Sequence, residues 1–410
     1  MAGWKKLSSD AVWHTADLYF QVFIQAAYLI VLSRALGPVE FGVFSSVAAI
    51  SIIISTFVGI GCDQLLIRNY VEGKSSVLDG YGTGLGSIAS TFPIALLIGF
   101  ISCSILNVKL EPIYIGMVLI SDLLFTKIVF LSSSCYWAIN HPVGKIKINL
   151  IATSTKMAFL LGAFFLLGDF GVKEWIPLYF ISILIGSLVS IGLVISEFGR
   201  PKVKFSWMSI KSGVAFCLEI SSLAVFKDID KPLVVKFLGP EIGGIYTAGF
   251  RVVDAATTPI RGLLNAVYTK YFKAGDINKE DLVFLKSMYM INIIAAFVIG
   301  LGIYLFSPVV ENIFGDRYHG IDEIVKAFAL FPFFLAVMAV SADGLRLVGL
   351  HNGRVLILIV SAAVFPILLS GFLINHDVHY AIWIRYGIQF IACVISIYII
   401  SKHFRLNKIR

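Results

Sequence analysis

Two copies of the tripeptide Leu-Gly-Pro, at Leu36-Gly37-Pro38 and Leu238-Gly239-Pro240, decide the fold of this chain. They lie 202 residues apart in a chain of 410 residues, and each ends a long apolar segment. Similar runs follow them, Gly42-Val43-Phe44 and Gly244-Ile245-Tyr246. A motif that returns after about half the chain indicates an internal duplication. Glycine can end a helix in the left-handed conformation, and proline cannot continue it. We therefore predict a tight turn between two helices in each half, which need not touch a substrate, built on Gly37, Pro38, Gly239 and Pro240.

The composition is that of an integral membrane protein. Hydrophobic residues make up 58% of the chain, charged residues 14%, and the mean hydropathy is +0.89. A helix needs about 20 apolar residues to cross a bilayer, and continuous rather than alternating runs indicate helices and not a barrel. Twelve such segments are predicted: 11–34, 41–62, 80–106, 112–138, 146–167, 175–197, 211–237, 242–270, 283–307, 323–348, 354–374 and 380–402.

The duplication and the basic residues predict the topology. We expect an all-α polytopic membrane protein with two six-helix lobes, 1–197 and 211–410, joined by a cytoplasmic linker at 198–210 and related by pseudo-two-fold symmetry along the membrane normal. With the N-terminus inside, 20 basic residues fall in inside loops and ends and 5 in outside loops, which predicts that both termini are cytoplasmic. The net charge of +8 is spread over seven inside segments, so it gives no indication of nucleic-acid binding.

Other motifs point away from catalysis. The five cysteines lie in or beside apolar segments without a C-x-x-C pair, so we predict neither a disulfide framework nor a metal site. No G-x-x-x-x-G-K-[ST] run occurs, and no cofactor is expected. The first apolar segment carries Asp17 and Gln21 without a small-residue cleavage site, so we interpret it as a retained helix.

Polar residues line one face of two predicted helices that correspond in the repeat. At 100° per residue, five residues of 11–34 lie within about 80° of one another: His14, Asp17, Gln21, Gln25 and Tyr28. The offset of 202 places Asp17 on Glu219, Gln25 on Lys227 and Tyr28 on Asp230. Glu219, Lys227, Asp230 and Lys231 span about 120° of their helix, and Asp228 lies off this arc.

A third stripe occupies the segment 242–270, where six polar residues span about 80°: Thr247, Arg251, Asp254, Thr258, Arg261 and Asn265. The corresponding positions of 41–62 are apolar, so the charge is concentrated in the second half. Lesser candidates inside predicted spans are Asp122, Lys127, Asn149, Thr153, Lys156 and Asp343.

Two interpretations of these charges remain open. Acids and bases three or four residues apart, such as Lys227 with Asp230 or Arg251 with Asp254, can neutralise each other and only brace helices. Charges near the end of a span, such as Lys326 and Arg385, are expected to reach the headgroups. We favour a shared aqueous cavity. The basic residues of this cavity would suit an anionic substrate: Lys227, Lys231, Arg251 and Arg261. The acids and amides would suit coupling to protons or sodium ions: Asp17, Gln21, Gln25, Glu219, Asp230 and Asp254.

The motifs resemble a known family. The run from Ser33 to Phe44 is similar to the first-hairpin signature of polysaccharide transporters of the O-antigen flippase (Wzx) type. Asp228-Ile229-Asp230-Lys231, followed by the run from Phe237 to Arg251, resembles their seventh and eighth helices more closely. The resemblance places the chain in the multidrug/oligosaccharidyl-lipid/polysaccharide (MOP) flippase superfamily.

This resemblance implies two six-helix lobes around a central cavity lined by the first and seventh helices. It implies a flippase of the bacterial inner membrane that carries an undecaprenyl-pyrophosphate-linked oligosaccharide to the periplasmic leaflet. The expected partners are this lipid-linked oligosaccharide, H⁺ or Na⁺ as coupling ion, membrane lipids and the polysaccharide polymerase machinery. Lys227, Lys231, Arg251 and Arg261 match in charge what a pyrophosphate needs, and Asp230 matches the acid of the family's seventh helix.

Two alternatives to a flippase remain. A multidrug and toxin exporter would share the fold, but its cavity would more often be acidic and aromatic than basic. A membrane-embedded polysaccharide polymerase or ligase would need a sizeable outside loop for catalytic groups. The outside loops are short, and the longest, 306–322, shows no further acid–base constellation. We therefore expect a transporter and not an enzyme.

Overall fold

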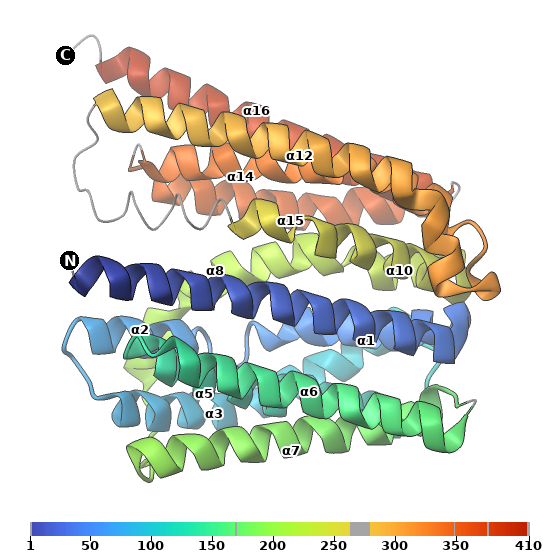
Figure 1. Cartoon of the computed structure of the whole chain (residues 1–410), viewed down its shortest axis with the longest axis horizontal. Coiled ribbons are helices and arrows are strands. Elements are labelled where there is room, and N and C mark those ends of the chain that lie inside the picture. The colour runs from blue at the N-terminus through green and yellow to red at the C-terminus, as the bar shows by residue number, and fades with distance from the viewer. Residues whose placement is uncertain (1, 169, 263–278, 348, 375–376, 408–410) are drawn as a thin grey trace. The chain divides into compact units, whose positions relative to one another are not determined.

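The computed structural model describes residues 2–168, 170–262, 279–347, 349–374 and 377–407 (Figure 1). Every regular element in these ranges is a helix. The contacts divide the chain into two compact units, Met1–Gly244 and Ile245–Arg410. This division by contacts differs from the division by sequence repeat, and the lobes 1–197 and 211–410 stay a prediction.

Helices meet at both Leu-Gly-Pro motifs with the same backbone conformation. In α1 (Ala2–Ser55) the residue Gly37 has φ 71° and ψ 170°, so α1 consists of two helices joined at a kink. The helix α9 (Asp230–Leu238) ends at Gly239, with φ 94° and ψ 162°, and α10 (Pro240–Ala256) begins at the following proline. Only glycine adopts this region readily, because it has no Cβ.

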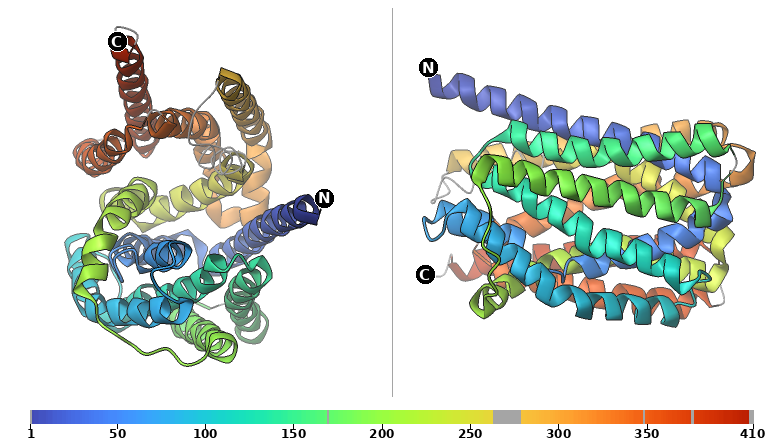
Figure 2. Two further views of the ribbon diagram at one scale, coloured as in Figure 1. Left: turned by 90° about the vertical axis from the view of Figure 1, so that its left-hand side faces the viewer. Right: turned by 90° about the horizontal axis from the view of Figure 1, so that it is seen from below.

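Helices α6 and α7 of the first unit run roughly along α1 (Figures 1 and 2). In this unit α6 packs against α7 and α1, α2 packs against α3 and α5, α5 packs against α6 and α7, and α1 packs against α8 and α9. Their bounds are α2 (Cys62–Val71), α3 (Val77–Ile105), α4 (Pro112–Ile120), a π-helical turn η1 (Ser121–Thr126), α5 (Lys127–Ala138), α6 (Pro142–Leu167), α7 (Val172–Phe198) and α8 (Trp207–Asp228).

The predicted continuous span 41–62 is broken near its end. The helix α1 ends at Ser55, and α2 begins at Cys62. Between them Gly59, Ile60 and Gly61 have φ of 72°, 41° and 69°, which a right-handed helix cannot contain. Apolar composition alone could not predict this break, because the hydrophobic pattern runs through it.

The second unit contains the end of α10 and the long helices α12, α14, α15 and α16 (Figure 1). Among these, α16 packs against α14 and α15, and α12 packs against α14 and the short α13. Their bounds are α12 (Lys279–Phe314), α13 (Ile321–Ala327), α14 (Phe331–Leu347), α15 (His351–Leu373) and α16 (His379–Asn407).

An aromatic cluster around Arg385 forms part of the core of the second unit. The guanidinium carbon lies 4.8 Å from the ring centre of Phe250, 5.2 Å from that of Phe365 and 5.8 Å from that of Phe331. These distances suit cation–π attraction. Arg385 is only 1% exposed, so the expectation that it reaches the headgroups is wrong. Lys326 was the other residue expected to reach the headgroups, and its Nζ donates a 2.9 Å hydrogen bond to Oδ2 of Asp322.

Nine helices, or ten if a bent pair counts as one span, are long and apolar enough to cross a membrane within the described ranges. The bent pair, Trp207–Val214 with Phe216–Leu238, corresponds to the predicted seventh span. The first and second predicted spans share the kinked α1. The eighth, 242–270, lies partly outside the described residues.

We expect Gly239→Ala to destabilise the protein through backbone strain alone. Nothing lies within 4 Å of a Cβ at this position, but φ is +94°, and such a conformation costs a non-glycine residue about 1–3 kcal/mol. The thermal unfolding midpoint in detergent should therefore fall. Gly192→Ala in α7, which also meets open space, is the control and should not lower it. Equal midpoints for the two variants would mean that the turn does not require glycine.

Candidate functional site

A break in the predicted seventh span brings three charged residues together. The helix α8 ends at Asp228 and α9 begins at Asp230, with Ile229 between them. Pro232, two residues further, has no N–H for the carbonyl of Asp228 and its ring crowds that carbonyl. The sequence Asp228-Ile229-Asp230-Lys231-Pro232 thus separates the two helices at a point where side chains replace backbone hydrogen bonds.

Lys231 is the centre of this break. Its Nζ lies 3.0 Å from Oδ1 of Asp228 and 3.2 Å from Oδ1 of Asp230, and it donates a 2.6 Å hydrogen bond to the carbonyl oxygen of Lys227. The side chains of Lys231 and Asp230 are fully buried, and that of Asp228 is 3% exposed. A buried charge is stable only when it is paired and hydrogen-bonded. Lys231 meets this condition with groups from both sides of the break.

Asp228 is a site residue that the sequence reasoning did not include. An uninterrupted helical wheel placed it off the polar face, and Lys227 was paired with Asp230. In the structure Asp228 is buried and bonds to Lys231. The wheel failed here because it assumes one continuous helix, whereas the helix is interrupted at Ile229. Proline four residues after Asp228 was the signal that could have found this break.

The remaining predicted residues of α8 and α1 lie partly toward solvent or lipid. Lys227 and Glu219 on α8 are half-buried, as is Gln21 on α1, whereas Gln25 is exposed. Asp17 lies in α1, but its side chain is outside the described part of the chain. The aromatic end of this stripe, Tyr28, has the ammonium of Lys156 over its ring at 4.3 Å.

In the second unit the stripe of α10 contains an ion pair across another helix break. Asp254 is paired with Arg261, whose side chain is 37% exposed. The carbonyl oxygen of Asp254 also accepts a 2.6 Å hydrogen bond from Oγ1 of Thr257. The helix is interrupted at Thr257, two residues before Pro259, so that residues seven apart can meet. Arg251 is half-buried, and Asn265 lies outside the described residues.

A buried polar cluster beside η1 draws on residues that the sequence analysis ranked lower or did not name. Asp122, in the π-helical turn, accepts a 2.6 Å hydrogen bond from the hydroxyl of Tyr179. The ring of Tyr179 packs edge-on against Phe44 at 5.4 Å and lies 6.0 Å from Trp175. Single-turn π-helices occur often at functional sites. Asp122 was named only as a charge inside a span, because its tyrosine partner is 57 residues away.

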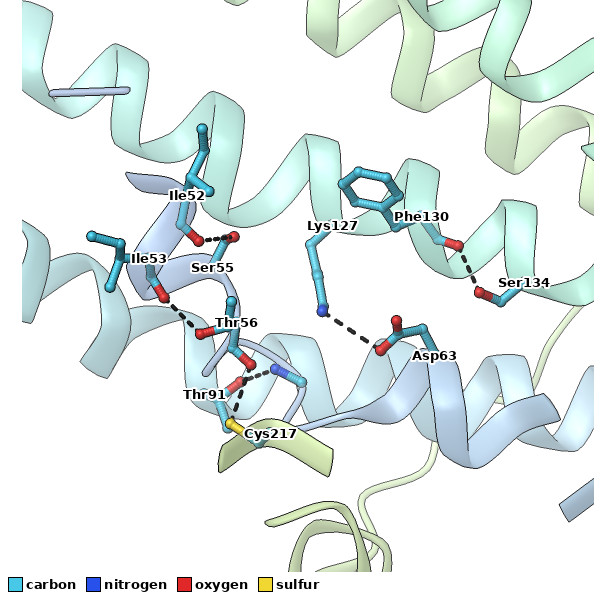
Figure 3. A network of polar contacts seen from close by, with 11 residues as sticks. Ile52, Ile53, Ser55, Thr56, Asp63, Thr91, Lys127, Phe130, Ser134 and Cys217 are labelled. Carbon is cyan, nitrogen blue, oxygen red and sulfur yellow. Dashed lines mark hydrogen bonds and ion pairs between the residues drawn. The ribbon is translucent and has the colours of Figure 1, made fainter. Parts of the chain in front are cut away.

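A second ion pair in the first unit joins α5 to the broken end of the predicted second span. Nζ of Lys127 lies 3.6 Å from Oδ1 of Asp63, and the side chains are 11% and 18% exposed. Figure 3 shows Lys127 reaching toward Asp63 beside this break, where the Sγ of Cys217 donates to the carbonyl of Thr56 at 3.3 Å. The lesser candidate Lys127 therefore has its partner on a different helix.

The family of the chain follows from comparison with known proteins. A model of the polysaccharide biosynthesis protein family matches residues 7–269, which include both Leu-Gly-Pro motifs and the break at Lys231. The chain belongs to this family. The resemblance seen in the two hairpins is thereby confirmed. A comparison with curated proteins found no match.

Solved structures of MATE transporters share the fold of this family member. An inward-facing multidrug resistance MATE transporter of the MOP superfamily matches with a TM-score of 0.71 and 14% identity, over 96% of this chain and 99% of the other. An outward-facing MATE transporter of the same superfamily matches with a TM-score of 0.63 and 15% identity, over 97% of this chain and 96% of the other. The MATE multidrug transporter DinF-BH matches with a TM-score of 0.61 and 16% identity, over 97% of this chain and 95% of the other. The predicted all-α polytopic membrane fold is confirmed, and it is a fold that these MATE transporters share.

We expect Lys231→Met to lower stability more than Asp228→Asn or Asp230→Asn. Removing the lysine leaves two buried carboxylates without their shared cation, whereas either asparagine variant keeps one ion pair. Breaking a buried ion pair from one side costs about 3–5 kcal/mol. Thermal unfolding in detergent measures the order. If Lys231→Met unfolded at or above the midpoint of both asparagine variants, the cluster would not hold the broken helix together.

Proposed function

We propose that the protein is a flippase for an undecaprenyl-pyrophosphate-linked oligosaccharide, the repeat unit of O-antigen or another surface polysaccharide. The observation that carries the proposal is the match to the polysaccharide biosynthesis family over residues 7–269, a range that holds the charged helix break. Transport would run from the cytoplasmic to the periplasmic leaflet of the bacterial inner membrane. We place both termini in the cytoplasm, because basic residues favour the inside.

The charges on α8, α9 and α10 support an anionic substrate. Lys227 and Arg251 are half-buried, and Arg261 is partly exposed, so their charged groups need not be fully desolvated before a ligand binds. Guanidinium and ammonium groups form short, charge-assisted hydrogen bonds to phosphate oxygens. Asp254 already holds Arg261, and a pyrophosphate would compete with this carboxylate.

Lys231 provides a way to couple substrate and cation. Its ammonium lies within 3.2 Å of two carboxylates. When a substrate phosphate draws this ammonium away, Asp228 and Asp230 are left together in a buried place. Two neighbouring carboxylates do not stay ionised together without a cation, so they would take up H⁺ or Na⁺. Alternating access of the two lobes around this region would then move the glycan.

A multidrug exporter is the second candidate, favoured by the fold shared with multidrug MATE transporters. This fold likeness, at 14% and 16% identity, does not concern the substrate. An exporter of organic cations would need acidic and aromatic groups free for binding. Three of the four buried acids among the described residues, Asp228, Asp230 and Asp254, have basic partners, and the fourth, Asp122, is bonded to Tyr179. The three ion pairs are the reason to prefer an anionic substrate.

We expect Lys227→Gln and Arg251→Gln to block glycan export without loss of membrane-inserted protein. Each removes a half-buried cation that would meet the pyrophosphate, and losing a charge-assisted bond to phosphate costs about 1.5–3 kcal/mol. Surface polysaccharide should fall at least tenfold, and lipid-linked oligosaccharide should accumulate on the cytoplasmic face. Lys402→Gln, at an exposed position of α16, is the matched control. Normal surface polysaccharide in both variants would refute the predicted basic cavity.

A deletion separates the two candidate functions. Cells that lack the protein should accumulate lipid-linked oligosaccharide, and they should show unchanged efflux of the cationic dye ethidium because an anion-binding site does not attract a cation. Dye efflux and accumulation of the lipid-linked intermediate are measured in the same strain. Lost dye efflux with normal surface polysaccharide would favour the exporter.

A further inference from the structure

The two Leu-Gly-Pro turns contact each other reciprocally. A Cβ at Gly42, four residues after Pro38, would overlap the carbonyl oxygen of Pro240. A Cβ at Gly244, four residues after Pro240, would overlap the carbonyl oxygen of Pro38. Each turn therefore rests on the glycine of the other, and both glycines are buried. The repeat places the same two residues, proline and glycine, on both sides of one backbone-to-backbone contact.

A second contact of the same kind lies at the other end of the helices concerned. A Cβ at Gly213, near the start of α8, would overlap the carbonyl oxygen of Ile60. In return a Cβ at Gly61 would lie 3.0 Å from the carbonyl oxygen of Gly213. One turn of helix further, the thiol of Cys217 donates to Thr56 (Figure 3). The broken helix α8–α9 is thus held to the first half of the chain near both of its ends.

Close glycine contacts suit surfaces that must separate and meet again. Without a Cβ, two backbones approach closely and gain only weak Cα–H···O bonds and dispersion. At the glycines themselves no side chain stands between the two backbones, so these points of contact can part without a rotamer change. The helix between the two contacts also has places to bend: its segments Trp207–Val214 and Phe216–Leu238 meet at 51°, and α8 gives way to α9 at Ile229.

We propose that these contacts are the two gates of the transport cycle. The Gly42–Pro240 and Gly244–Pro38 pair is the outer gate, and the Gly213–Ile60 contact is the inner gate. When the transporter opens at one end, the contact at that end breaks while the contact at the other end stays formed. A side-chain bond, from Nζ of Lys236 to the carbonyl of Ile105 at 3.1 Å, belongs to the outer gate. The proposal rests on the proposed transport function but not on the identity of the substrate.

Alanine substitutions at the two gates test the proposal because they should have opposite effects. Gly42→Ala and Gly244→Ala each place a methyl group on a backbone oxygen of the outer gate and should favour the outward-open state. Gly213→Ala should favour the inward-open state. Gly192→Ala, whose added Cβ meets nothing within 4 Å, is the control and should leave the equilibrium unchanged.

Accessibility of one introduced cysteine reports the equilibrium. Gln25→Cys, at an exposed position of the polar stripe of α1, is placed in a background without other cysteines, with Cys217→Ser to keep a donor to Thr56. A membrane-impermeant maleimide is added to intact cells and, separately, to inside-out vesicles. We expect the outer-gate variants to raise labelling from outside by about fivefold and lower it from inside, the scale of a typical conformational coupling. Gly213→Ala should do the reverse.

Lys236→Met covers the case in which an alanine variant does not fold. It adds no overlap; it removes the exposed bond to Ile105 and a contact of the ammonium with the neighbouring ring of Phe237 on the same helix. It should therefore raise outside labelling in the same direction as Gly42→Ala. Labelling that moves in the same direction for both gates, or stays at the level of Gly192→Ala in folded variants, overturns the proposal. The labelling experiment requires no glycan, so it tests the gates independently of the substrate. If the variants of the two gates shift the labelling in opposite directions but the protein has no effect on lipid-linked oligosaccharide, the gates are supported and only the proposed flippase function is contradicted.

Discussion

The ammonium of Lys231 holds together a membrane helix that would otherwise be broken in an apolar environment. In lipid, backbone groups released by a helix break must find partners within the protein. The ammonium of Lys231 is such a partner for the carbonyl of Lys227, and it also binds Asp228 and Asp230 on the two sides of the break. The same helix bends by 51° further toward its start, where Trp207–Val214 meets Phe216–Leu238. Through this helix the second copy of the repeat reaches the first.

Helix interruptions accompany several of the acids that lie buried in or beside spans. Asp122 lies in a π-helical turn, Asp63 lies in the first turn of the helix that follows an irregular stretch, and Asp254 meets Arg261 across the interruption at Thr257. A continuous helix presents its side chains in fixed rows, whereas an interruption lets residues at other spacings meet. In each of these cases the acid has a base or a hydroxyl within bonding distance, as burial of a charge requires.

The duplication has two distinct consequences. It sets the architecture, because each Leu-Gly-Pro turn ends one helix and begins the next. It also makes the two turns complementary to each other, since the proline carbonyl of one copy meets the glycine of the other. A repeat related by a two-fold axis generates such contacts in pairs, in the same way as an isologous dimer interface. The glycines that follow the motif are therefore as informative as the motif itself.

The sequence by itself determined the membrane class, most of the helical segments and the repeated Leu-Gly-Pro motif, because these depend on apolar length and on motifs local in the chain. It also identified Lys227, Lys231, Asp230 and the charges of α10 as unusual, since charge inside a span is costly wherever it lies. Only the tertiary structure decided the partners: Asp228 for Lys231, Arg261 for Asp254 and three aromatic rings around Arg385. Partners depend on where helices break and on which helices pack together, and neither is visible in a helical wheel that assumes continuity and isolation.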